Sequence, residues 1–62
     1  MDNLTIDEIM VQFGNDFESI NVIRNTDGLI RQYLVHVRFG ELFYTDANLK
    51  NALLQALKDK PL

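Results

Sequence analysis

"RQYLVHVRFGELFYTD", residues 31–46, decides the fold, because two runs of alternating apolar residues flank a Gly-Glu pair within it. Tyr33, Val35 and Val37 alternate with polar residues, as expected for a strand with one buried face. Gly40-Glu41 has the glycine-first form of a type II′ hairpin turn. This turn predicts three cross-strand pairs: Phe39 with Leu42, Val37 with Tyr44, and Arg38 with Phe43.

A second hairpin precedes this one. Residues 20–24 are rich in β-branched side chains, and Asn-Thr-Asp-Gly at 25–28 is a cluster of turn formers. The strand that follows is expected to span residues 29–39. The sequence therefore predicts a meander of three antiparallel strands.

The length of the first loop decides which side chains of this hairpin share a face. A two-residue loop would set Arg24 directly opposite Arg31, which is unfavourable. A three-residue loop would put the apolar residues of the first strand on the face opposite Tyr33. A four-residue loop keeps the apolar residues on one face, with Gly28 at positive φ and Ile20 paired with Tyr33. We predict this register.

A helix is expected on each side of the meander. Thr5 and Glu8 have the spacing of a capping box, and Gly14 fits the left-handed position after a helix that spans residues 5–13. Its apolar face is Ile6, Ile9, Met10 and Phe13. A final helix begins after a cap at Thr45 or Asp46 and ends before Pro61. Its apolar face is Leu49, Ala52, Leu53, Ala56 and Leu57.

These elements predict a single α+β domain over residues 1–62, a small two-layer α-β-β-β-α fold with a three-stranded antiparallel meander. Each helix has one apolar face, so both helices are expected to pack on one face of the sheet. The expected buried set is Ile6, Ile9, Met10, Phe13, Ile20, Val22, Tyr33, Val35, Val37, Phe39, Leu42, Tyr44, Leu49, Leu53 and Leu57.

The other face of the sheet is expected to be bare, with apolar residues at its centre. The predicted interaction residues on it are Ile23, Ile30, Leu34, His36, Arg38 and Phe43. An apolar patch with a polar rim often marks an interaction site. The alternative is an ordinary sheet with one solvated face.

Self-association is expected because the core is marginal. A domain of 62 residues buries only about 60% of the surface of its unfolded chain, and this chain has no cysteine for a disulfide. Like patches on identical chains satisfy one another in a two-fold dimer, so we expect a homodimer through the bare sheet face. Pairing of strand edges is the less favoured route.

The charge distribution favours a protein partner over a nucleic acid. The net charge is −3, and every acid in the leading third of the chain precedes the first basic residue, Arg24. This acidic surface is Asp7, Glu8, Asp16 and Glu18. It suggests a second hypothesis, an acidic inhibitor or decoy for a basic groove. The alternative class is a weak single-stranded nucleic-acid binder that uses Arg38, His36 and Phe43.

No motif for catalysis is recognisable. His36 is the only histidine, Ser19 is the only serine, and cysteine is absent. We therefore expect no enzyme, no bound metal and no cofactor. The amino terminus lacks a secretory signal and no apolar run is long enough to span a membrane, so a cytoplasmic protein is expected.

Overall fold

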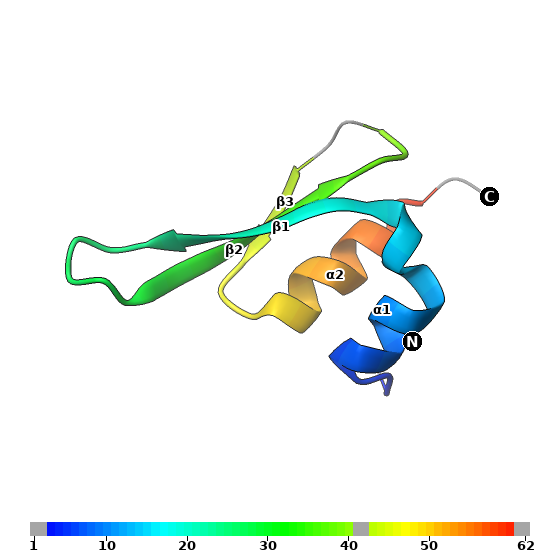
Figure 1. Ribbon diagram of the computed structural model, residues 1–62, viewed down its shortest axis with the longest axis horizontal. Coiled ribbons are helices and arrows are strands. Elements are labelled where there is room, and N and C mark those ends of the chain that lie inside the picture. The colour runs from blue at the N-terminus through cyan, green and yellow to red at the C-terminus, as the bar shows by residue number, and fades with distance from the viewer. Residues whose placement is uncertain (1–2, 41–42, 61–62) are drawn as a thin grey trace.

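The computed structural model describes residues 3–40 and 43–60 and has three antiparallel strands in one sheet with two helices (Figure 1). The α+β class is therefore as predicted. The elements in chain order are α1 (Ile6–Phe13), a 3₁₀ turn (Gly14–Asp16), β1 (Phe17–Arg24), β2 (Ile30–Val37), β3 (Phe43–Asp46) and α2 (Leu49–Lys58). The strand order in the sheet is β1-β2-β3.

The capping box at the start of α1 is confirmed. The Glu8 N–H donates to Thr5 Oγ1 at 3.1 Å, and the Thr5 N–H donates to Glu8 Oε1 at 2.9 Å. The predicted left-handed end of the helix is wrong, because Gly14 has φ −56° and ψ −31° and its N–H donates to the Met10 carbonyl. Gly14 continues the helical backbone, so the 3₁₀ turn makes the reversal into β1.

The hairpin of β1 and β2 has the predicted faces but another register. Gly28 has φ +86°, as predicted, yet the Asn25 N–H donates to the Leu29 carbonyl at 2.8 Å, which shortens the loop to residues 26–28. An irregularity in the pairing leaves Arg31 out of the register, and beyond it Ile20 pairs with Val35 instead of Tyr33. A three-residue loop alone would have reversed the faces. The extra residue in β2 restores them, because each one-residue shift exchanges the two faces of a strand.

The second hairpin is also shifted by two residues. Tyr44 pairs with Val35 and Phe43 pairs with His36, so the predicted partners Val37 and Arg38 are wrong. The backbone N–H of Arg38 instead donates to the Asp16 carbonyl at 2.9 Å, just past the end of β2. Leu42, the predicted partner of Phe39, and the turn residue Glu41 lie outside the described residues. A shift of two leaves every side chain on its predicted face.

The cap of α2 lies later than predicted. Asn48 is the N-cap, and its Oδ1 accepts the Asn51 N–H at 3.1 Å. Asp46 belongs to β3. Its carboxylate accepts hydrogen bonds from the Asn48 backbone N–H at 2.8 Å and from Gln55 Nε2 at 3.1 Å. This carboxylate joins the end of the sheet to the start of the helix.

The core lies between α2 and the sheet. α2 packs against β2 and β3, and α1 packs beside α2. The buried apolar residues are Ile9, Phe17, Val35, Val37, Ala52, Leu53, Ala56 and Leu57. Phe13, Phe39, Tyr44 and Leu49 pack partly buried against this cluster.

The hairpin of β1 and β2 extends beyond the helices as an arm (Figure 1). The molecule is accordingly elongated, with extents of 40 × 26 × 15 Å. Ile20 and Val22, which the sequence placed in the core, are therefore exposed on this arm. Ile6 and Met10 of α1, also expected in the core, are exposed as well. Phe17 was not predicted to be buried. It enters the core because the pairing shifts at Glu18, which changes the alternation at the start of β1.

Val35→Ala and Val22→Ala form a matched test of this core. Both positions are on the helix-side face, but Val35 is fully buried and Val22 is 42% exposed. Val35→Ala should lower the free energy of unfolding by about 1–3 kcal/mol through lost burial and a cavity, and Val22→Ala by about 0.5 kcal/mol or less. Urea unfolding measures both. Equal losses would contradict the placement of α2 over only one end of the sheet.

Candidate interaction surface

The register defines the outer face, the sheet face opposite α2. On β2 its residues alternate with the buried valines. On β1 and β3 its residues alternate with those that pair with the helix-side residues of β2. The outer-face residues are Ser19, Asn21, Ile23, Gln32, Leu34, His36, Phe43 and Thr45. No described helix packs on this face, so its side chains are solvated or half-buried.

An apolar stripe crosses the outer face diagonally. Phe43 lies opposite His36, Leu34 is the next outer-face residue along β2, and Ile23 lies beyond it on β1, opposite Gln32. Diagonal neighbours on one face are about 7–8 Å apart, within reach of large side chains. Phe43, Leu34 and Ile23 therefore lie as diagonal neighbours in a stripe that crosses all three strands.

Ile30 lies outside this stripe, contrary to the prediction. It pairs with Arg24 beyond the extra residue Arg31, and so leaves the alternation that contains Leu34. It is exposed near the end of the arm. The predicted patch of four apolar residues is therefore a stripe of three, and the bulge is the reason.

Phe43 is the most exposed residue of the stripe, at 60%, and its ring contacts a second aromatic ring. The His36 ring stacks on it with centroids 4.4 Å apart and an angle of 15° between the planes. The shift of the second hairpin creates this contact, because the predicted register put Arg38 opposite Phe43. Stacking of this kind favours the observed orientation of the Phe43 ring.

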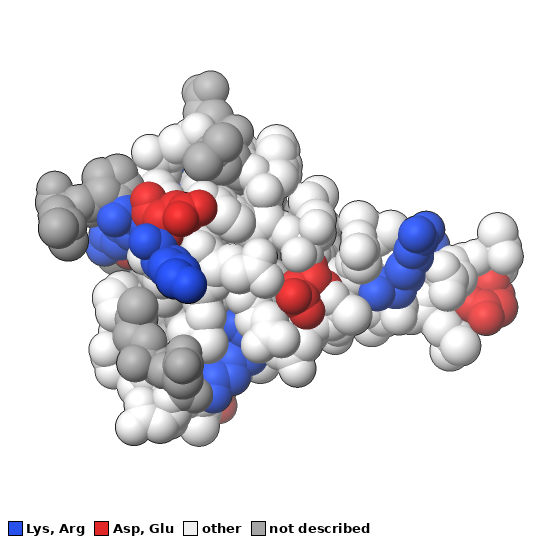
Figure 2. Space-filling view, turned by 180° about the vertical axis from the view of Figure 1, so that it is seen from behind, with Lys and Arg blue, Asp and Glu red and all other residues white. Residues whose placement is uncertain are grey.

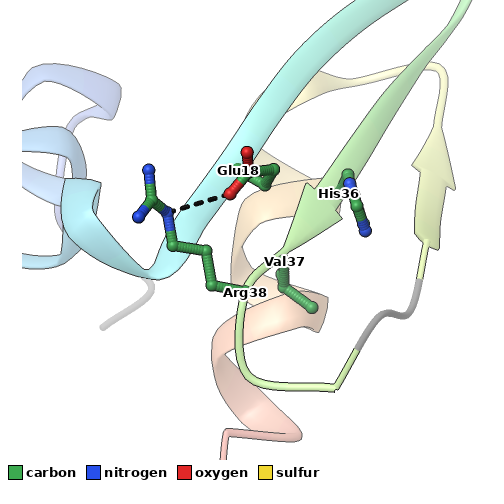
Figure 3. A pocket seen from close by; sticks show the side chains of 4 residues that line it. All are labelled: Glu18, His36, Val37 and Arg38. Carbon is green, nitrogen blue, oxygen red and sulfur yellow. Dashed lines mark ion pairs between the residues drawn. The ribbon is translucent and has the colours of Figure 1, made fainter.

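Arg38 and Glu18 form the polar rim at one end of the outer face. Arg38 Nε lies 3.1 Å from Glu18 Oε2, and the side chains are 63% and 52% exposed. An exposed pair of this kind contributes little to stability. Together with His36 and the adjoining Val37 the two side chains line a shallow, open hollow, in which the Arg38 guanidinium turns toward β1 (Figure 3).

The predicted acidic surface is divided between two places. Asp7 and Glu8 lie in the first turn of α1, whereas Asp16 and Glu18 lie beyond its other end. Asp16 pairs with Lys60 at 2.8 Å, and Lys60 Nζ also lies 5.6 Å from the centre of the Phe13 ring. Two hydrogen bonds lower the pKa of the Glu8 carboxyl, first the one with the Thr5 backbone N–H and then the one with the Thr5 side chain. Of the four acids, three therefore have structural partners.

Ser19 and His36 are directly opposite each other in the register. Ser19 Oγ accepts a hydrogen bond from Asn21 Nδ2 at 3.4 Å, while the imidazole stacks on Phe43. Within residues 3–40 and 43–60, no group of three or more His, Asp or Glu side chains is placed to hold a metal ion. None of the described helices is long and apolar enough to cross a bilayer.

Comparison with protein-family models, with curated proteins and with solved structures found no match to this chain.

One exposed surface was missed in the sequence. Ile20 and Val22 were placed in the core, but they lie on the arm, where β1 is exposed along nearly its whole length. The lengths of the elements explain this exposure. A strand of eight residues is about 26 Å long, whereas a helix of ten residues is about 15 Å long and cannot cover it.

The pKa of Glu8 leads to a prediction for acid stability. Because the folded protein favours the carboxylate, this contribution is fully present above the unfolded pKa of about 4.3 and is lost as the pH falls through the lowered folded pKa. Glu8→Gln keeps an acceptor for the Thr5 N–H but removes the titration. Urea unfolding should show that the free energy of unfolding of the parent falls toward that of Glu8→Gln as the pH drops through this window. A constant difference between the two proteins would contradict the prediction.

Proposed function

We propose that this protein is a small non-catalytic interaction module and that the outer face is its binding surface for a larger protein. The observation that carries the proposal is the stacked, exposed Phe43 at one end of an apolar stripe that no described helix covers. Aromatic anchors fixed before binding supply much of the energy of protein interfaces. The rim of Arg38 and Glu18 offers both signs of charge for orientation.

The alternative of single-stranded nucleic-acid binding has less support. Base stacking needs an open aromatic face, and His36 covers one face of the Phe43 ring. Arg38 is paired with Glu18, and the net charge is −3. Phosphate binding depends on Lys and Arg neutralising the backbone, so a nucleic acid is the weaker candidate.

The hypothesis of an acidic inhibitor or decoy also has less support. Such a surface needs several carboxylates that converge on a basic groove. Here Glu8 caps its helix, and Asp16 and Glu18 are ion-paired. The outer face therefore remains the better candidate for the binding site.

The double variant Leu34→Ser, Phe43→Ser tests the outer face. It should keep the circular-dichroism spectrum of the parent but lose proteins that the parent captures from a lysate of its native host. Val11→Ser is the matched control, because Val11 is 86% exposed on α1 and lies away from the sheet. Capture by the parent and by Val11→Ser, but not by the double variant, is the expected result.

Two outcomes would contradict the proposal. If all three proteins captured the same partners, the outer face would be an ordinary solvated surface. If a labelled single-stranded oligonucleotide bound the parent at low salt, lost affinity steeply with salt and failed to bind the double variant, the face would be a nucleic-acid site.

A further inference from the structure

α1 contributes little to the core compared with α2. Of its eight residues, Ile9 alone is buried. Phe13 packs partly buried against the core cluster, whereas Ile6 and Met10, on the same apolar face as Ile9, are each 37% exposed. Segments with few buried apolar contacts open locally at a lower free energy than the rest of a domain. α1 is therefore the helix that is easier to detach.

α1 is also too short to remain helical away from the core. It has eight residues, and isolated helices shorter than about 12–15 residues are marginal in water. The capping box of Thr5 and Glu8 acts within the first turn of the helix. Detachment of α1 therefore includes unwinding, which opens its backbone amides to hydrogen exchange.

The backbone departs from helical values at the end of α1. Phe13, the last residue of the helix, has φ −127° and ψ 9°, and the 3₁₀ turn follows it. This turn is anchored to the sheet, because the Asp16 carbonyl accepts the Arg38 N–H at 2.9 Å. Phe13 thus lies between a weakly held helix and an anchored turn, and hinges are formed by such residues at the ends of elements.

Lys60, from the other end of the chain, reaches this junction. Its Nζ donates to Asp16 Oδ2 at 2.8 Å and lies 5.6 Å from the centre of the Phe13 ring. The side chains of Lys60 and Asp16 are 39% and 24% exposed, so this ion pair is less solvated than that of Arg38 and Glu18. One ammonium group therefore contacts both sides of the hinge.

The backbone around Lys60 is tied to α2. The N–H groups of Asp59 and Lys60 donate to the carbonyls of Ala56 and Leu57, both at 3.2 Å. The Asp59 carboxylate also accepts the Tyr44 hydroxyl of β3 at 2.9 Å. Figure 2 shows acidic and basic side chains at the end of the molecule away from the arm, where Figure 1 places α1 and the end of α2. Lys60 thus extends over the junction from a base that α2 and β3 provide.

We propose that α1 is a hinged lid, which opens about Phe13 as a unit while α2 and the sheet stay folded, and that Lys60 is the clasp that holds it closed. Opening removes Ile9 from the buried cluster and uncovers apolar core surface beside α2. This inference goes beyond the proposed function, because it concerns the helix layer and not the outer face.

Native-state hydrogen exchange of the parent tests the lid. The amides of Ile9 and Gly14 report on α1, since they donate to the carbonyls of Thr5 and Met10. The amide of Val35 reports on the sheet, because β2 is paired on both sides. Amides from residue 9 to residue 14 should share one opening equilibrium and be protected at least about tenfold less than Val35. Their opening should depend little on urea below the unfolding transition, because it exposes little surface.

Lys60→Gln tests the clasp, because it removes the charge and keeps most of the side-chain length. It should raise the opening equilibrium of α1 about three- to tenfold, through loss of the ion pair and of the contact with the ring. Lys58→Gln is the matched control, an exposed lysine in the last turn of α2, and should leave this equilibrium unchanged. Asp16→Asn should also raise it, and the effects of Asp16→Asn and Lys60→Gln should not add.

Three results would overturn the proposal. If the α1 amides had the protection and urea dependence of Val35, α1 would open only when the whole domain unfolds. If protection were graded from one end of α1 to the other, the helix would fray and not open as a unit. If Lys60→Gln changed the opening of α1 no more than Lys58→Gln, Lys60 would not be the clasp. The first two results come from the parent protein and need no variant to fold.

Discussion

The packing of α2 on the valines of β2 is the contact on which the rest of the structure depends. Val35 and Val37 are fully buried beneath Ala52, Leu53 and Ala56 of the helix. Small alanine side chains let the helix approach the sheet closely, so a few apolar residues fill the space between the layers. The other elements contact this helix. α1 packs beside α2. β3 is linked to the α2 region by two hydrogen bonds, from the Tyr44 hydroxyl to Asp59 Oδ2 and from Gln55 Nε2 to Asp46 Oδ2.

The small extent of this contact explains the shape of the molecule. The helices cover only one end of the sheet, and the hairpin of β1 and β2 continues past them as the arm (Figure 1). On the arm, apolar residues such as Ile20 and Val22 are on the core face but have no helix to contact. So small a core leaves apolar residues exposed, and the outer face of the sheet is one of the surfaces that α2 does not cover.

Two irregularities in strand pairing decide which residues reach these surfaces. The shift at Glu18 sends Phe17 into the core, and the extra residue Arg31 compensates for a short loop. Without the second irregularity the two strands of the first hairpin would present their apolar residues to opposite faces. The same irregularity removes Ile30 from the stripe of Leu34 and Phe43. A single extra residue thus both preserves the core and defines the edge of the candidate site.

The sequence by itself determined the features that depend on neighbouring residues. The capping box of Thr5 and Glu8, the positive φ of Gly28 and the alternation of Val35 and Val37 follow from local backbone chemistry, and all three are present. Only the tertiary structure decided the register of both hairpins and the extent of helix coverage. Register depends on irregularities that have no local signature, and burial depends on where α2 stops. For that reason the sequence placed Leu34 and Phe43 on the correct face, but not the stacking of Phe43 on His36 or the exposure of β1.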